Sequence, residues 1–170
     1  MNILYIASSL DGFIAGPGGD ISWLFHDGDY GFSKFMKDIG TVVMGRKTYD
    51  FGVKHSNPPF PDKKNIIITK NASLHKFSTQ QVIFCSLKYL HKLLRQNKLS
   101  KNVWLVGGTA LISDFINKDI LDEIVLSIQP IILGKGAPLF DKIKNQKRLK
   151  LTNQKTYPGG LVQLIFKFVD

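Results

Sequence analysis

Residues 103–111 read Val-Trp-Leu-Val-Gly-Gly-Thr-Ala-Leu, a short apolar run followed by two glycines and a hydroxyl residue. The run is typical of a buried strand, and Thr109 opens a segment typical of a helix. Ligands of open α/β sheets bind beyond the carboxyl ends of the strands. A glycine pair there lets a ligand approach the backbone, and the N–H groups at a helix start favour phosphate. A tight turn would also explain the glycines, so support must come from elsewhere.

A second glycine turn repeats this pattern earlier in the chain. Residues 42–44 form an apolar run, Gly45 follows, and Arg46-Lys47-Thr48 opens the next helix-like segment. Two cations at a helix N-terminus oppose the helix dipole, but they suit an incoming anion with several charges. The alternative is a surface helix with solvated basic side chains. A third strand-like run ends in Thr69 followed by Lys70, so three strand ends carry groups that favour an anion.

Strand-like and helix-like segments alternate along the whole chain, which predicts α/β layers around one sheet. Repeats and linkers are missing, so we expect one domain over residues 1–170. The chain ends in two alternating segments joined by Pro158-Gly159-Gly160, typical of an antiparallel hairpin. The predicted strands are 2–8, 41–44, 65–69, 82–85, 102–106, 124–130, 149–157 and 161–169, and the predicted helices are 31–38, 46–51, 87–97 and 109–117.

The composition fits a cytoplasmic globular domain. The chain has 170 residues, of which 44% are hydrophobic and 21% charged, enough apolar residues for a real core. Cys85 is the single cysteine, so an internal disulfide is impossible, and its apolar neighbours predict a buried thiol. We expect no targeting leader, and no apolar run approaches the roughly 18 residues of a membrane helix. We therefore expect a soluble, cytoplasmic protein.

The net charge of +10 is compatible with nucleic acid, a membrane surface or an anionic small molecule as partner. Residues 142–150 hold five Lys and Arg, which we interpret as a solvated face. A stripe of basic residues interleaved with aromatics is missing, so a nucleic-acid-binding module is a remote alternative. The histidines show no metal-ligand spacing, and no Ser-His-Asp or phosphate-loop motif is present. We expect neither a metal site nor a membrane partner.

The order of the segments resembles the dihydrofolate reductase superfamily. The stretch Ser9-Leu10-Asp11-Gly12 is more similar to riboflavin-biosynthesis reductases, the RibD C-terminal domain branch with its stand-alone bacterial relatives, than to true dihydrofolate reductases. The resemblance implies a three-layer α/β/α fold with a mostly parallel sheet, and a bacterial NADPH-dependent oxidoreductase. Five stretches carry it, and they span nearly the whole chain: residues 7–15, 42–49, 64–69, 103–111 and 121–126.

The resemblance also implies where NADPH would lie, namely across the carboxyl edge of the sheet. Ala7 and Ile14 would flank the nicotinamide, and the glycine-rich loop 11–20 would form a mobile lid. In this superfamily the Gly107–Gly108 bond would be cis. The residues expected to hold the 2′-phosphate and pyrophosphate are Gly45, Arg46, Lys47, Thr48, Thr69 and Lys70 on one side, and Val106, Gly107, Gly108, Thr109 and Ala110 on the other.

In dihydrofolate reductases a helix carboxylate binds the pterin and assists protonation. The resemblance places Asp29 at that position as the candidate catalytic and substrate-binding residue, with Asp27 as an alternative. Trp23, Phe32 and Phe35 would wall this carboxylate in, and desolvation would raise its pKa toward neutral pH. The other reading is that both aspartates are solvated or cap the following helix.

The remaining expectations concern the substrate. The long loop 53–61, with Phe60 between Pro59 and Pro61, would line the cleft. Trp23 is also expected to contact the substrate, and Ser127 lies near a substrate-contacting position. Lys63 falls near an arginine of folate reductases, and lysine cannot form the planar bidentate grip. We therefore expect a small heterocycle, most like 5-amino-6-(5-phosphoribosylamino)uracil, with dihydrofolate or another pterin as the alternative. The riboflavin enzyme usually carries a deaminase domain, for which 170 residues leave no room, so a stand-alone reductase of another substrate stays open. The C-terminal hairpin offers an edge for a homodimer.

Overall fold

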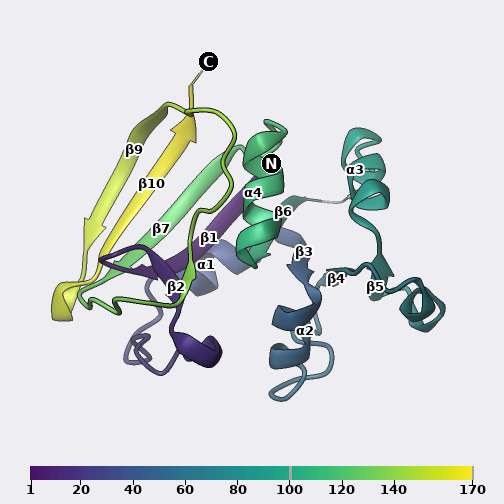
Figure 1. Cartoon of the computed structure of the whole chain (residues 1–170), viewed down its shortest axis with the longest axis horizontal. Helices are drawn as coiled ribbons and strands as arrows, with labels where there is room; N and C mark the ends of the chain where they lie inside the picture. The colour runs from purple at the N-terminus through teal and green to yellow at the C-terminus, as the bar shows by residue number, and fades with distance from the viewer. Residues whose placement is uncertain (100, 170) are drawn as a thin grey trace.

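A computed structural model describes residues 1–99 and 101–169 and contains one eight-stranded sheet in the order β5-β4-β3-β6-β1-β7-β10-β9 (Figure 1). Its strands are parallel from β5 to β7, and β10 is antiparallel to both of its neighbours. The sheet strands are β1 (Asn2–Ser9), β3 (Ile39–Gly45), β4 (Lys64–Ile68), β5 (Val82–Cys85), β6 (Asn102–Gly107), β7 (Glu123–Gln129), β9 (Leu149–Thr156) and β10 (Val162–Phe168).

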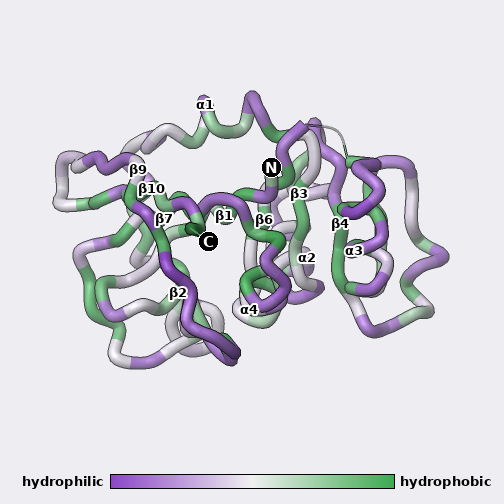
Figure 2. Tube along the Cα trace, turned by 90° about the horizontal axis from the view of Figure 1, so that it is seen from above, coloured by the Kyte–Doolittle hydropathy of each residue, from purple (hydrophilic) through white to green (hydrophobic). Residues whose placement is uncertain are grey.

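Helices cover both faces of this sheet (Figure 2), which confirms the predicted three-layer α/β/α fold. α1 (Phe32–Lys37) packs on one face, and α3 (Leu87–Arg95) and α4 (Thr109–Asn117) pack on the other. α2 (Arg46–Gly52) follows the carboxyl end of β3. Five short elements were not predicted. Four of them have only two or three residues, which carry no periodicity: β2 (Phe13–Ala15), β8 (Ala137–Pro138), η1 (Pro17–Gly19) and η3 (Pro158–Gly160). The fifth is the six-residue 3-10 helix η2 (Ala72–Phe77).

The core on the α3–α4 side is aliphatic. Leu90 and Leu93 of α3 are buried one turn apart, and Phe115 of α4 is completely buried beside Leu105 of β6. Each helix is therefore held by its apolar stripe rather than by its intrinsic helix propensity. Cys85 is buried in the same layer, and burial raises the pKa of its thiol to about 11. The predicted burial of this thiol is confirmed.

The core on the α1 side is aromatic. Phe32 and Phe35 of α1 surround Tyr5, with ring centroids 5.7 and 4.4 Å away, and both rings also contact Trp104. The Trp104 indole N–H donates to Tyr5 O at 3.0 Å, so the largest ring of this layer has its polar atom satisfied. These rings fill the space between α1 and strands β1 and β6.

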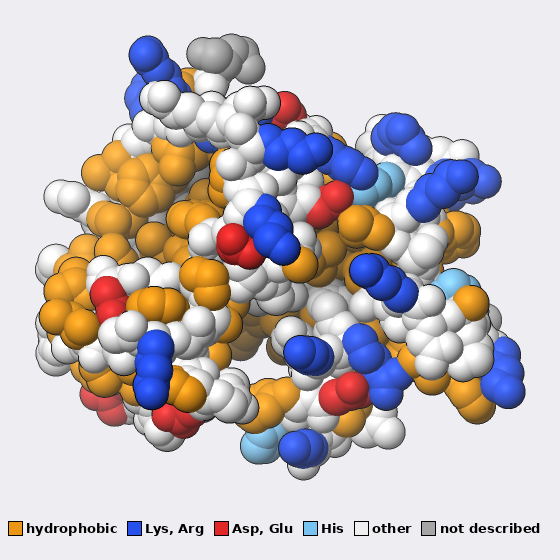
Figure 3. All heavy atoms as spheres, viewed as in Figure 1, with side chains coloured by type: hydrophobic (Ala, Val, Ile, Leu, Met, Phe, Trp, Pro, Cys, Tyr) orange, Lys and Arg blue, Asp and Glu red, His pale blue; other side chains and the backbone are white. Residues whose placement is uncertain are grey.

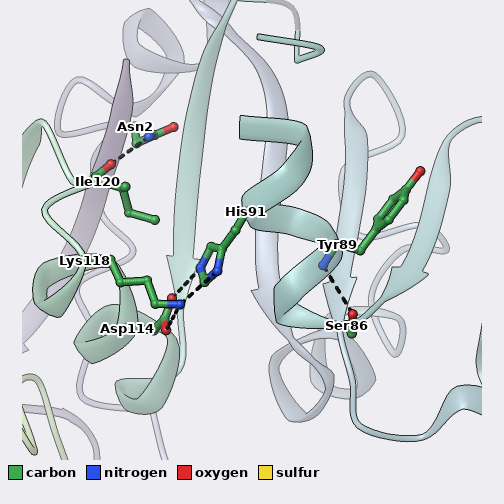
Figure 4. A network of polar contacts seen from close by, with 7 residues as sticks. All are labelled: Asn2, Ser86, Tyr89, His91, Asp114, Lys118 and Ile120. Carbon is green, nitrogen blue, oxygen red and sulfur yellow. Dashed lines mark hydrogen bonds and ion pairs between the residues drawn. The ribbon is translucent and has the colours of Figure 1, made fainter. Parts of the chain in front are cut away.

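A polar contact links α3 to α4 (Figure 4). His91 Nε2 lies 2.7 Å from Asp114 Oδ2, and Lys118 Nζ lies 3.0 Å from His91 Nδ1. Because Nδ1 accepts from the ammonium group, Nε2 carries the ring hydrogen and donates to the carboxylate. Ser86 Oγ accepts from Tyr89 N at 3.3 Å and caps the start of α3. A hollow of about 300 Å³ beside this contact is lined by Leu87, Lys88, His91, Arg95 and Lys118.

The C-terminal hairpin completes the sheet as predicted. β9 and β10 pair antiparallel, with a register shift between Ile165 and Phe166, and residues 158–160 join them. β9 forms one edge of the sheet and is exposed along its whole length. Within the described ranges, every helix is too short or too polar to cross a membrane.

Candidate functional site

The two glycine turns face each other at the carboxyl edge of the sheet. β3 and β6 are neighbours, and Met44 at the end of β3 lies opposite Gly107. A Cβ atom on Gly45 would lie 4.0 Å from Gly107 O, and one on Gly108 would lie 3.9 Å from Thr48 Oγ1. The fold therefore brings together two turns that lie more than sixty residues apart in the sequence.

The backbone of the second turn explains its glycines. Gly107 has φ +139°, and Gly108 has φ +97° with ψ 117°, which are conformations that other residues rarely adopt. The predicted cis bond between them is wrong: across residues 1–99 and 101–169, the one cis peptide bond is Asn57–Pro58. The positive φ angles turn the chain into α4 with a trans bond.

The space between the turns is suited to an anion. α2 and α4 begin directly after Gly45 and Gly108, and glycine has no side chain with which to cap a helix. Leu111 N donates to Gly108 O at 2.9 Å, so the N–H groups of Thr109 and Ala110 lie ahead of the first helical hydrogen bond. Such groups carry partial positive charge and bind phosphate. A methyl group on Gly108 would project into this space, where a phosphate needs room.

Cations gather on the α2 side of this space. The surface is hollowed between the β2 side and the α2 side, with Lys and Arg on the latter (Figure 3). Arg46 Nε donates to Asp50 Oδ1 at 2.5 Å, which orients a guanidinium that is 40% exposed. Lys47 and Lys70 are exposed. Thr69 is buried, and its hydroxyl oxygen accepts from Asn71 N at 3.1 Å, so it shapes the turn that presents Lys70.

The two residues expected to flank the nicotinamide lie on neighbouring elements. Ala7 is half-buried in β1, and Ile14 is half-buried in β2 and packs against the aliphatic core. The first half of the predicted lid is held in place, because β2 pairs with β8 and Asp11 accepts hydrogen bonds from residues far along the chain. Loop residues Pro17–Asp20 are exposed.

Asp29 does not lie in a dry pocket. It is exposed, and its Oδ1 accepts from Ser33 Oγ at 2.6 Å and from Ser33 N at 3.0 Å. The Ser33 hydroxyl, and after it the Ser33 amide, lowers the pKa of this carboxyl. The predicted raised pKa is wrong, because Phe32 and Phe35 pack against Tyr5 and Trp104 instead of walling Asp29 in. The alternative reading, a residue that caps the start of α1, fits the contacts.

The Asp29 contacts lead to a prediction about pH. Because the folded-state pKa is lowered, the cap is fully present above the ordinary value of 3.8 and is lost as the pH falls through the lowered pKa. We expect the Ser33 amide resonance to titrate with a midpoint below 3.8 in an NMR pH series. A midpoint above this value would mean that the carboxyl is desolvated and would restore the raised pKa.

A hydrogen-bond centre at Tyr30 O, which the sequence did not reveal, is connected to the predicted substrate residue Ser127 through Gln163. Tyr5 OH donates to this carbonyl at 3.0 Å, Tyr157 OH at 3.1 Å and Gln163 Nε2 at 3.3 Å. Gln163 Nε2 also donates to Ser127 Oγ at 3.1 Å, which places the predicted Ser127 inside this network. Burial raises the pKa of Tyr5, so its hydroxyl stays protonated. The three donors come from β1, from β10 and from the turn between β9 and β10, and only the fold brings them together.

The other predicted substrate residues have structural partners. Lys63 Nζ donates to Met36 O at 2.8 Å and closes the C-terminus of α1. Phe60 packs edge-on against Trp104 with ring centroids 5.0 Å apart. The Trp23 indole N–H donates to Asp20 O at 3.1 Å. Tyr30 OH donates to Asp27, the alternative carboxylate. Throughout the described part of the chain, groups of three or more possible metal ligands are missing.

Comparisons with known proteins agree with this geometry. The Bacillus subtilis protein YyaP is 37% identical over 177 residues, covering 96% of this chain and 93% of YyaP. A dihydrofolate reductase of Aedes albopictus is 32% identical over 133 residues, covering 73% of this chain and 70% of that protein.

Solved structures share the fold. A putative riboflavin biosynthesis protein from Shewanella sp. PV-4 has a TM-score of 0.82 at 24% identity, with 99% of each chain covered. A dihydrofolate reductase from Enterococcus faecalis, complexed with NADP(H) and RAB-propyl, has a TM-score of 0.73 at 19% identity, covering 100% of this chain and 97% of that one. The RibD C-terminal domain family matches residues 2–163. This chain therefore belongs to the RibD C-terminal domain family, whose fold it shares with the dihydrofolate reductases.

Proposed function

We propose that this chain is an NADPH-dependent reductase that transfers hydride to a small heterocycle, most like 5-amino-6-(5-phosphoribosylamino)uracil. The observation that carries the proposal is the pair of facing glycine turns, each followed by a helix without a side-chain cap. Related reductases in the same family and a dihydrofolate reductase complexed with NADP(H) support it. The cofactor, when bound, would supply the hydride, and the protein orients it and excludes water.

In this proposal the two glycine turns, at Gly45 and at Gly107–Gly108, form the cofactor half of the site. The N–H groups of Thr109 and Ala110 and the Thr48 hydroxyl would hold the pyrophosphate. Arg46 and Lys70, with Lys47 beside them, would hold the 2′-phosphate, since guanidinium and ammonium groups both pair well with phosphate oxygens. Ala7 and Ile14 would flank the nicotinamide.

The substrate half favours a small ring over a pterin with a long tail. Aromatic side chains already fill the space between α1 and the sheet, and Lys63 is committed to the end of α1. Buried neutral groups remain, among them Ser127 and Gln163. Neutral hydroxyl and amide groups suit a heterocycle that carries carbonyl and N–H groups. Asp29 has no support here as a proton relay, because its ionised form is the favoured one.

The discrimination between NADPH and NADH tests the cofactor assignment. We expect the wild-type chain to bind NADPH more tightly than NADH in calorimetric titrations. Lys70→Ala should lower the NADPH affinity about tenfold, the effect of one charged contact, and leave NADH binding unchanged. Lys150→Ala, an exposed lysine of β9, is the matched control and should change neither. Equal wild-type affinities for both cofactors would contradict the assignment.

The substrate class needs a separate assay. We expect NADPH oxidation, followed by its absorbance, with 5-amino-6-(5-phosphoribosylamino)uracil and only background oxidation with dihydrofolate. Turnover of dihydrofolate would instead support the pterin alternative. Tight NADPH binding without turnover of either compound would keep the reductase assignment and exclude both substrates.

A further inference from the structure

We propose that Asp11 is a positioning residue that clamps the nicotinamide-side loop to the cofactor turn. The loop is residues 10–15, and the clamp acts through residues 131–144, which we call the strap. The catalytic consequence rests on the proposed function, whereas the clamp itself does not. The linkage runs from the Asp11 carboxylate to the strap, and from the strap to α4 and its glycine turn.

The Asp11 carboxylate joins the loop to the strap. Its Oδ1 accepts from Ser9 Oγ at 2.6 Å and from Leu133 N at 3.1 Å, and its Oδ2 accepts from Gly134 N at 2.7 Å. Ser9 Oγ in turn accepts from Phe13 N at 2.9 Å. Hydrogen bonds to an ionised acceptor are stronger than neutral ones. The Ser9 hydroxyl is the main cause that lowers the Asp11 pKa, so the carboxylate stays charged at neutral pH.

The backbone of the loop follows the same path. Leu10 N donates to Ile131 O at 2.8 Å, and Leu139 N donates to Gly12 O at 2.8 Å. β2 and β8 pair in between. A Cβ atom on Gly136 would lie 2.0 Å from Ala15 O, so the two segments approach as closely as only glycine permits. The loop therefore lies directly against the strap.

A polar seam on α4 fixes the strap in turn. Thr109 Oγ1 donates to Pro138 O at 2.6 Å, and Ser113 Oγ donates to Asp141 O. Asn117 Nδ2 donates to Lys142 O at 3.0 Å, and its Oδ1 accepts from Lys144 N at 2.9 Å. These three residues are spaced by four, so they form one stripe along the helix. Thr109 is also the first residue after the glycine turn, so the seam starts at the cofactor site.

The consequence is that loop, strap and α4 behave as one body. Ile14, which would lie against the nicotinamide, keeps a fixed position relative to Gly107 and Gly108. Motion of the lid is then confined to the residues after Ala15, where Gly18 and Gly19 have φ +70° and +85°. If loss of the clamp leaves the loop in its bound position for only a fraction of the time, the apparent cofactor affinity is reduced to that fraction of its original value.

Hydrogen exchange and NADPH titration of Asp11→Ala, Asp11→Asn and Asp62→Ala test the proposal. Asp62 is an exposed aspartate outside the linkage and serves as the matched control. For Asp11→Ala we expect exchange in residues 10–15 and 131–139 to become about tenfold faster, and NADPH affinity to fall about tenfold. Asp11→Asn keeps an oxygen acceptor and should show an intermediate loss in both measurements. Asp62→Ala should match the wild type.

Two results would overturn the proposal. Unchanged hydrogen exchange in Asp11→Ala would show that Asp11 does not clamp the loop. Faster exchange with unchanged NADPH affinity would show that the clamp does not position the cofactor site. Thr109→Val, which keeps the side-chain shape, is the second variant if Asp11→Ala does not fold, and it should speed exchange in residues 137–139. A wild-type chain that does not bind NADPH would refute the proposed function, while exchange would still decide the clamp.

Discussion

Gly108→Ala is expected to lower NADPH affinity about a hundredfold, or about 2.8 kcal/mol, while the chain still folds. Gly108 has φ +97° and ψ 117°, a conformation in which any L side chain is strained. The added methyl group would also point toward Thr48 Oγ1, 3.9 Å away, into the space between the two helix starts. Backbone strain and a blocked phosphate position therefore act at the same residue.

The control for Gly108→Ala must separate the effect of backbone strain from the effect of a blocked phosphate position. Gly160, in the turn between β9 and β10, has φ +88°, and a Cβ there would meet Pro130 at an ordinary 3.6 Å. Gly160→Ala should lower the melting temperature through strain but leave NADPH affinity unchanged. If Gly108→Ala lowers stability and keeps wild-type NADPH affinity, the turn is structural and the cofactor site lies elsewhere.

Phe115→Ala is expected to destabilise the chain by about 3–5 kcal/mol in urea unfolding. Phe115 is completely buried in the aliphatic core between α4 and the sheet. Its loss removes apolar contact area and leaves a cavity that the surrounding strands cannot fill. A change of this size is a large part of the roughly 5–15 kcal/mol that stabilises a typical domain.

Phe77→Ala is the matched control, because Phe77, the last residue of η2, is 59% exposed. It should change the unfolding midpoint little, since its ring is largely hydrated in the folded chain. An unchanged midpoint in Phe115→Ala would mean that α4 is not held by this side chain. α4 also begins at the glycine turn, so we expect Phe115→Ala to weaken NADPH binding near its unfolding midpoint.

The juxtaposition of the two glycine turns could be predicted because its signals are local. A strand, a glycine and a helix start follow each other within a few residues at Gly45 and at Gly107, and parallel pairing places their ends at one edge. Element bounds were predicted to within a few residues for the same reason. The cis geometry expected at Gly107–Gly108 was wrong, since positive φ angles achieve the same turn.

The substrate half could not be predicted because its signals are long-range. The Tyr30 carbonyl collects donors from Tyr5, Tyr157 and Gln163, which no sequence spacing relates. Asp29 was placed in an aromatic pocket on the basis of nearby rings, yet those rings face the sheet and the carboxylate caps α1. Which side of a short helix faces inward depends on tertiary packing, and α1 has only six residues.

The position of β1 has a consequence for folding on the ribosome. The first strand to be synthesised lies between β6 and β7, whose residues, 102–107 and 123–129, are made much later. Until these strands are made, β1 has no strand to pair with, and Leu4 and its other apolar residues stay exposed. Pairing between such distant segments is also slow. Sheet assembly is therefore completed only after most of the chain has left the exit tunnel, and a chain truncated before β7 would leave β1 as an aggregation-prone edge.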